Sequence, residues 1–190
     1  EIPEEERALY NEKLIDSLYQ KFQENEIDDT QTVEELKEML KGKKILITAP
    51  GKSMMDEKDR IQSLIEQVDM FIICVNSIPD YITPDLLFIS NQKRFHQIKK
   101  DYGLKNLPCP VAATSNIDAG KSVKYMVNYS ELTMSDAMIS DNACLMLFNL
   151  LMKMGVDEIN VVGFDGYHTN VERNYYAQNL INNTDREKLR

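Results

Sequence analysis

The chain has 190 residues, of which 43% are hydrophobic and 28% charged, and this composition is typical of a folded globular domain and excludes a disordered or fibrous protein. A chain of this length buries roughly 70% of its unfolded surface, so we expect a hydrophobic core. The net charge is −9, and residues 1–41 carry 13 acidic and five basic side chains. DNA and RNA require a basic surface, which neither part of the chain offers, so we expect no binding to a nucleic-acid polymer.

Residues 1–42 are predicted to form two helices that act as a connector or packing arm. Residues 4–24 place an apolar stripe opposite a charged face, as an amphipathic helix requires. In the second helix, Thr32 and Glu35 have the spacing of a capping box, and Gly42 ends the helix.

From residue 43 to residue 190, short apolar runs alternate with helical segments, which predicts a parallel sheet. Most of the runs are apolar throughout, as in strands that helices cover on both faces. The predicted strands are residues 45–49, 70–75, 86–90, 111–115, 125–129 and 159–164, and the predicted helices between them are 54–68, 92–102 and 141–154, the last being the most apolar. The sequence therefore predicts an α/β fold: a Rossmann-like three-layer domain with a mostly parallel sheet of about six strands, preceded by the N-terminal helical pair.

The cysteines and the hydropathy of the chain indicate a cytoplasmic protein. Cys74, Cys109 and Cys144 lie far apart in apolar runs, which indicates buried thiols and no disulfide or zinc framework. No apolar stretch approaches the ~20 residues needed to cross a bilayer, and no signal-peptide pattern precedes the first helix, so we expect no membrane contact. Because the chain begins at Glu1 without a methionine, we expect it to be part of a longer polypeptide. The sequence is compatible with a homo-oligomer.

Polar side chains follow the predicted strands at the points where the strands end. In open α/β sheets the ligand binds outside the carboxyl ends of the strands, so these side chains form the predicted ligand site. Hydroxyls and amides, which both donate and accept hydrogen bonds, suit a base, a ribose or a sugar, and suit a metal poorly. The predicted ligand-binding residues are Gly51, Lys52, Ser53, Asn76, Ser90, Asn91, Ser115, Asn116, Asn128, Asp165 and Tyr167.

The turn after the first strand is the most specific feature of the predicted ligand site. Gly51 allows close approach of the backbone, Lys52 adds positive charge, and Ser53 can cap a helix that begins at Met54, whose free N–H groups favour a phosphate. In a second interpretation, Ser53 and Asp56 form a capping box with no ligand. The first turn of a sheet is a frequent phosphate site, so we favour the phosphate contact.

Several familiar site patterns are absent from the sequence. Two Gly-Lys-Ser tripeptides, at 51–53 and 120–122, lack the glycine that a P-loop needs five positions earlier, where Leu46 and Ser115 stand. The Gly-x-Gly-x-x-Gly fingerprint of NAD and FAD sites is missing too. No metal-ligand cluster can be identified from the spacing.

The remaining polar residues each have two interpretations. A single asparagine is common in turns, but three at successive strand ends favour a shared site. Asp165 either caps the following turn or binds a ribose hydroxyl. His96 lies in a helical segment, where we expect a structural or exposed side chain. His168 follows Tyr167 at the exit of the last strand and is the histidine placed for acid–base work, so His168 and Tyr167 are the candidate catalytic residues.

Three segments resemble the domain that follows the barrel in aldolases of the HMG-CoA lyase-like and 4-hydroxy-2-oxovalerate aldolase-like group: KKILITAPGKSMMDEKDRI, IICVNSIPDYITPDLLFISNQKRF and DNACLMLFNLLMKMGVDEINVVGFDGY. Proteins of this group are often found with bacterial surface-polysaccharide genes. The resemblance covers nearly the whole chain and implies that its partner is an N-terminal aldolase barrel of the same polypeptide. In the group, a His-x-His pair and a carboxylate of the barrel hold the metal, and His96 and His168 form no such pair. The lyase chemistry would therefore belong to the barrel.

The exit at 163–167, the strand-one turn and Asn76 more distantly resemble bacterial sialyltransferases that use CMP-sialic acid, and pterin pyrophosphokinase-like domains. This resemblance implies a nucleotide or nucleotide-sugar ligand, such as a CMP-linked sugar. It implies phosphate contacts at Gly51 and Ser53 and base or ribose contacts at Asn76 and Asn91.

Three functions follow from these observations. The first is an accessory domain of an aldolase that binds a nucleotide or nucleotide-sugar and has no aldolase chemistry of its own. The second is a glycosyltransferase-like enzyme that uses an activated sugar. The third is a structural domain that mediates assembly.

Overall fold

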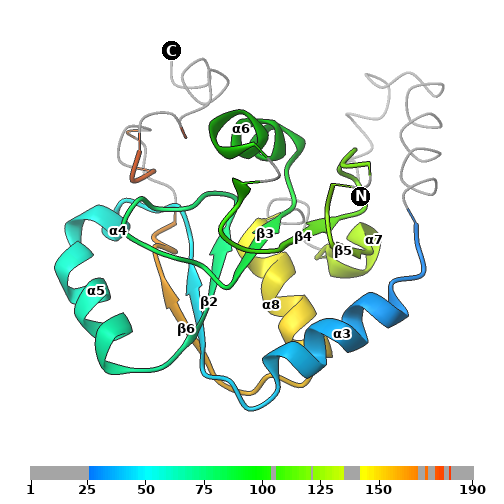
Figure 1. Ribbon diagram of the computed structural model, residues 1–190, viewed down its shortest axis with the longest axis horizontal. Coiled ribbons are helices and arrows are strands. Elements are labelled where there is room, and N and C mark those ends of the chain that lie inside the picture. Colours follow the sequence, from blue (N-terminus) through cyan, green and yellow to red (C-terminus); the bar gives the residue numbers. More distant parts are fainter. Residues whose placement is uncertain are drawn as a thin grey trace, which may run out of the picture.

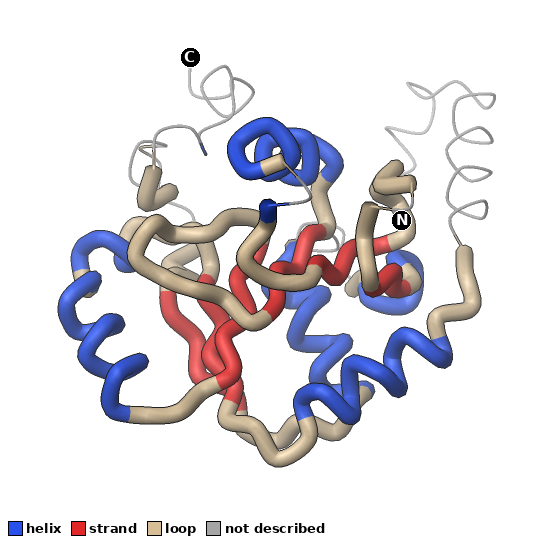
Figure 2. The backbone as a smooth tube through the Cα atoms, viewed as in Figure 1, coloured by secondary structure: helices blue, strands red, loops and turns tan. Residues whose placement is uncertain are grey.

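The computed structural model describes residues 26–103, 106–120, 122–134, 142–166, 170, 174–177 and 180. Within these residues, helices cover both faces of one central sheet (Figures 1 and 2). The predicted helix over residues 4–24 lies outside the described residues, as do Tyr167 and His168.

All six predicted strands are present, and every neighbouring pair in the sheet is parallel. The order across the sheet is β5-β4-β3-β2-β1-β6. Five of the strands end one or two residues earlier than predicted. The strands are β1 Ile45–Thr48, β2 Phe71–Val75, β3 Leu86–Ile89, β4 Val111–Thr114, β5 Tyr125–Val127 and β6 Ile159–Val162.

The helices form one layer on each face of the sheet. The helices are α3 Thr30–Leu40, α4 Ser53–Asp56, α5 Lys58–Gln67, α6 Gln92–Tyr102, α7 Tyr129–Leu132 and α8 Ala143–Lys153. One core lies between the sheet and α3, α7 and α8, and it contains Ile45 and Ile47 of β1. The other lies between the sheet and α4, α5 and α6, and it contains Leu46. Side chains of a strand alternate between the faces, so an apolar strand such as β1 fills both cores. The predicted α/β fold with a parallel sheet is confirmed.

Two of the three helices on the first face, α8 and α3, differ in how much they bury. α8 buries five of its eleven residues, more than any other described helix, as its apolar sequence predicted. α3 buries Leu36 and Leu40 in the same core, so this part of the predicted arm covers the sheet. α3 begins at Thr30, where the Asp28 carboxylate accepts hydrogen bonds from the Thr30 N–H and hydroxyl. The expected start at a box of Thr32 and Glu35 is wrong.

The predicted helix over residues 54–68 is two helices. The break falls at Glu57, whose φ of −110° and ψ of 19° are not helical. The hydroxyl of Tyr81 donates a hydrogen bond to the Met54 carbonyl, which would otherwise accept the N–H of Lys58 in a continuous helix. The cause lies 27 residues away in the sequence, so local periodicity did not reveal it.

The residues predicted to end the fifth strand belong to a short helix. α7 begins at Tyr129, and Asn128 occupies its N-cap position. Asn128 and Tyr129 are therefore not strand residues, and the prediction of a strand over 125–129 is wrong at its last two positions.

The strand order places the topological switch between β1 and β6. The chain leaves β1 toward α4 and α5 on one face, and it enters β6 from α8 on the other face (Figure 1). In open α/β sheets, ligands bind outside the carboxyl ends of the strands at the point where the strand order reverses, and here the order reverses between β1 and β6. The fold therefore directs attention to the exits of β1 and β6.

Candidate functional site

The exits of β1 and β6 cross in direct backbone contact. The Gly51 N–H donates a 2.8 Å hydrogen bond to the Gly163 carbonyl. A Cβ at Gly51 would lie 2.3 Å from that carbonyl oxygen and 2.6 Å from Oδ2 of Asp165. A Cβ at Gly163, whose φ is +74°, would lie 2.1 Å from the Ala49 carbonyl oxygen. Both glycines are therefore needed for the contact between the two strand exits.

The Asp165 carboxylate binds the start of α4. Its Oδ2 accepts a 2.7 Å hydrogen bond from the Ser53 N–H, and its Oδ1 accepts a 2.5 Å bond from the Ser53 hydroxyl. α4 begins at Ser53, one residue earlier than expected, and the Asp56 N–H bonds the Lys52 carbonyl. The predicted cap by Ser53 and its capping box with Asp56 are therefore wrong. The anion at this helix start is a side chain of the protein itself.

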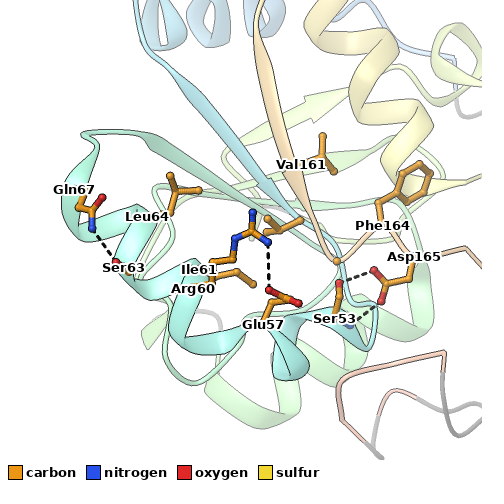
Figure 3. Close-up of a pocket in the computed structure, with 12 residues that line it drawn as sticks. Ser53, Glu57, Arg60, Ile61, Ser63, Leu64, Gln67, Val161, Phe164 and Asp165 are labelled. Atoms are coloured by element: carbon orange, nitrogen blue, oxygen red, sulfur yellow. Dashed lines mark hydrogen bonds and ion pairs between the residues drawn. The ribbon is translucent and has the colours of Figure 1, made fainter.

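A groove of about 760 Å³ runs along α5 and β6 from this crossing (Figure 3). α5 contributes one wall with side chains spaced three or four residues apart, and β6 and its exit contribute the other. The volume lies within the range of small-molecule sites. The lining residues are Ser53, Glu57, Arg60, Ile61, Ser63, Leu64, Gln67, Val161, Val162, Gly163, Phe164 and Asp165.

The groove combines one cation and two carboxylates, those of Glu57 and Asp165, with an apolar surface and a few hydrogen-bonding groups. The Arg60 side chain is 87% exposed, and its nearest charged partner is Glu57 at 3.5 Å. The ring of Phe164 is exposed and meets Phe148 of α8 edge-on, with 5.8 Å between the ring centroids. Such a groove offers an exposed guanidinium to an anion and an aromatic ring to a planar group.

The amides at the exits of β2, β3 and β4 hold the rim together. Asn76, at a φ of 58°, accepts the Ser90 N–H through its side-chain oxygen at 3.2 Å. Asn116 donates to the Ser90 carbonyl at 3.4 Å and accepts the Thr114 hydroxyl at 2.6 Å. The structure brings these three predicted residues together in one chain of hydrogen bonds between the strand exits.

The other predicted rim residues also have partners within the protein. Asn91 caps α6 by accepting the N–H groups of Lys93 and Arg94, at 2.9 and 3.2 Å. Ser115 accepts the Tyr129 N–H at 3.0 Å. Asn128 is buried, and its N–H donates to the Asp29 carboxylate at 2.7 Å. Lys52 forms an exposed ion pair with Asp56 at 3.8 Å.

A segment near the C-terminus, residues 174–177 and 180, lies over the exits of β1 and β2, and we call it the C-terminal strap. The Tyr176 N–H donates to the Pro50 carbonyl at 3.1 Å, and its ring packs on the α6 side of the sheet. Burial raises the pKa of the Tyr176 hydroxyl to about 12, and a hydrogen bond with Ser77 opposes this shift. The buried Arg94 guanidinium donates to the Leu180 carbonyl.

Two hollows of unequal size lie near the strand exits. A smaller one, of about 370 Å³, lies between the β2 exit, α6 and the strap, and Asn76 is the one predicted ligand-binding residue in its lining. The larger one is the groove at β1 and β6, which contains Ser53 and Asp165. Among the described residues, the topological switch and the larger hollow therefore coincide.

Arg60, Glu57 and Gln67 were not predicted from the sequence as site residues. They follow one another along one face of α5, together with Leu64. The helical spacing of these residues is visible in the sequence, but their importance depends on β6 lying beside β1, which the sequence does not state.

The described residues hold no metal site and no reactive thiol. In the described ranges, no three side chains of His, Cys, Asp or Glu gather closely enough to bind a metal ion. Burial raises the pKa of Cys74 and Cys144 to about 12. For Cys109, which is half-buried, burial raises the pKa to about 11. All three thiols are free; Cys74 and Cys144 are buried as predicted, whereas the prediction of a buried thiol is wrong for Cys109.

The candidate catalytic residues, Tyr167 and His168, lie outside the described residues. His96 is exposed on α6, and its ring lies 3.0 Å from the side-chain amide of Gln92, in agreement with the expectation for this residue. No helix in the described part of the chain is long and apolar enough to cross a membrane.

No protein-family model, characterised protein or solved structure matches this chain. The resemblances to an aldolase C-terminal domain and to sialyltransferases therefore stay predictions from the sequence segments that carry them.

Proposed function

We propose that this domain binds a nucleotide or a nucleotide-linked sugar in the groove between α5 and β6. The observation that carries the proposal is the position of the groove. The end of the groove that contains Ser53 and Asp165 lies at the exits of β1 and β6, where the strand order reverses. Its volume of about 760 Å³ accommodates a ligand of this size.

The phosphate groups of the ligand would bind Arg60. Its exposed guanidinium can form two parallel hydrogen bonds with a phosphate, and its present partner Glu57 is an exposed carboxylate at 3.5 Å, which makes a weak pair. The earlier phosphate prediction used the donors of Ser53, which Asp165 now occupies. A phosphate at Ser53 would have to displace a carboxylate of the same charge, so Arg60 is the better phosphate residue.

The ribose or sugar hydroxyls would bind Asp165. Each of its carboxylate oxygens accepts one hydrogen bond from Ser53, and a carboxylate oxygen has two acceptor positions. One position on each oxygen is therefore available to a sugar hydroxyl. The sequence left two roles open for Asp165, a cap of the following turn or a contact with a ribose hydroxyl, and its place at the rim of the groove supports the ribose contact.

The base would lie against the apolar part of the groove. Phe164 presents an exposed ring on the α8 side of the groove, and Val161 and Leu64, which are exposed as well, line the same groove. Stacking of a base on an aromatic ring contributes roughly 1–3 kcal/mol and tolerates any base. This contact supports nucleotides as a class and does not choose among them.

As to the role of binding, we propose an accessory domain of an aldolase, with the lyase chemistry on the N-terminal barrel. The sequence resemblance alone supports this step. The alternative, sugar transfer, rests on Tyr167 and His168 and on the same groove holding the activated sugar.

The proposal is tested by differential scanning fluorimetry of the 190-residue chain with CMP, CDP, UDP, GDP and their sugars. A ligand at 100 times its Kd stabilises the folded state by about 2.7 kcal/mol, which raises Tm by roughly 5–10 °C for a chain of this length. We expect at least one nucleotide to do so, and product formation in the same mixtures would favour sugar transfer. No shift with any of these ligands would contradict the proposal.

A matched pair of variants locates the site. Arg60→Gln removes the proposed phosphate contact and should reduce the Tm shift, since a hydrogen bond to a charged group contributes about 1.5–3 kcal/mol. Lys100→Gln removes an exposed charge from α6, outside the groove. We expect the Lys100 variant to keep the full shift, and equal shifts in both variants would place the ligand elsewhere.

A further inference from the structure

β6 is an edge strand with little to prevent another strand from pairing with it. It is the last strand in the sheet order, and no described residue pairs with its outer side. Its sequence Ile-Asn-Val-Val contains neither a charged residue nor a proline, the features that usually protect exposed edges. The side chain of Asn160 turns back to the Ile45 carbonyl at 3.3 Å, so it does not protect the edge either.

The register shows which backbone groups of β6 are free to pair. The Val162 carbonyl accepts the Ala49 N–H at 2.9 Å, so the N–H and carbonyl of Val162 face β1. Neighbouring residues of a strand direct these groups to opposite sides. The N–H and carbonyl groups of Ile159 and Val161 therefore point away from the sheet.

Exposed apolar side chains gather on both sides of this edge. Among the described residues, six large hydrophobic side chains are exposed, and four of them lie around β6: Leu64, Val161, Phe164 and Met152. Leu64 lies on α5, on one face of the sheet, and lines the groove with Val161 and Phe164. Met152 follows Phe148, the ring partner of Phe164, by four residues and so lies on the same side of α8. We call these four residues the edge patch.

The backbone of this edge is complementary to itself. Two copies of β6 that pair antiparallel about a two-fold axis satisfy each other's outward backbone groups and bring the two edge patches together. The start of one strand then lies beside the end of the other. Asp157 and Glu158 are exposed at the start of β6, and Arg60 is exposed near its end together with Glu57 and Asp165, so the acidic residues of each copy approach one arginine and two carboxylates of the other.

The size of the edge meets the needs of a specific dimer. α8 has 11 residues and is therefore about 16 Å long, and three layers of roughly 10 Å each make the edge about 30 Å wide. The face measures roughly 500 Å² per copy, or about 1,000 Å² for the pair, which is near the lower limit of specific interfaces.

We infer that the chain forms a two-fold dimer in which β6 of one copy pairs antiparallel with β6 of a second copy, extending the sheet across the interface. The inference concerns a surface, needs no nucleotide, and does not rest on the proposed function. A dimer of moderate affinity fits an interface of this size, so the dimer should form at micromolar concentrations and above.

Sedimentation velocity from 1 to 200 µM, without nucleotide, tests this inference. We expect the 22.0 kDa chain to reach twice that mass with increasing concentration, and a chain that stays monomeric throughout would overturn the inference. Val161→Lys places a charge on the edge and should abolish the dimer, whereas Met134→Lys changes a similarly exposed side chain outside the edge patch and should leave it intact. Circular dichroism shows whether both variants fold. A dimer that survives Val161→Lys in a folded protein would overturn the proposed interface.

Hydrogen exchange of the wild-type protein gives a second test that needs no variant. The Val161 amide should exchange more slowly at 200 µM than at 1 µM, because pairing protects it. If its exchange rate is the same at both concentrations, β6 is not the interface. A dimer found with no nucleotide binding would leave the inference standing and count against the proposed function alone.

Discussion

Replacing Gly51 by alanine tests the crossing of the β1 and β6 exits. The new Cβ would lie 2.3 Å from the Gly163 carbonyl oxygen and 2.6 Å from the Asp165 carboxylate. The first of these is backbone, so one of the two strand exits must move. Overpacking of this kind costs about 1–3 kcal/mol, and with two contacts this short we expect the upper end, about 3 kcal/mol.

A control variant separates the steric cost of a side chain at Gly51 from the conformational cost of replacing a glycine elsewhere. Gly51 is not among the glycines with positive φ, so its cost is steric, whereas Gly42 has a φ of +68° and nothing within 4 Å of a Cβ. Gly42→Ala should therefore lower the free energy of unfolding by only about 1 kcal/mol, which is the cost of holding an alanine in the left-handed conformation. In thermal unfolding, Gly51→Ala should lower Tm by roughly 6–12 °C and Gly42→Ala by roughly 2–4 °C. A Gly51→Ala protein that melts no lower than the Gly42 variant would refute the crossing.

Three further predictions concern the same elements. Asp165→Asn removes a charged acceptor from Ser53 and, because the site is exposed, should lower the free energy of unfolding by only about 1 kcal/mol in a urea titration; an unchanged midpoint would contradict the pairing. Cys74 and Cys144, whose pKa values burial raises to about 12, should react with Ellman's reagent at pH 8 only when urea unfolds the protein, and rapid labelling of the native chain at either residue would be inconsistent with their burial. Burial raises the pKa of Tyr176 from 10 to about 12. The contribution of this residue to stability is therefore complete below pH 10 and is lost as the pH rises toward 12, by about 3 kcal/mol in total. Tyr176→Phe should flatten this pH dependence, and an equally steep decline in the variant would show that Tyr176 is not its source.

The strands were predictable because each is a short apolar run that fills both cores. The sequence 45–49 is apolar at every core position and β1 is buried throughout. In the same way, the uniform apolar character of α8 indicated its burial. These features depend on local composition alone, which the sequence states directly.

The order of the strands and the break between α4 and α5 were not predictable from local patterns. β6 lies beside β1 although more than a hundred residues separate them, and nothing in either strand specifies its neighbour. The break follows from Tyr81, whose hydroxyl takes the Met54 carbonyl. Both features come from contacts between distant segments.

The candidate site was likewise predictable only in part. Gly51, Ser53 and Asp165 were predicted to share one rim, and the structure joins them, but as partners of one another. Polar residues at strand ends are as suitable for joining the ends as for holding a ligand, so residue type alone could not separate the two roles. Arg60 was missed because the wall that it forms exists only when α5 stands beside β6.

Binding in the groove is tested most directly by a nucleotide titration of ¹⁵N-labelled protein followed by NMR, using the ligand that raises Tm most. A ligand in the groove should cause the largest amide shifts at Ser53, Arg60 and Phe164, on both walls of the groove. Shifts concentrated instead at Asn116 and Asn128, at the exits of β4 and β5, would contradict binding in the groove.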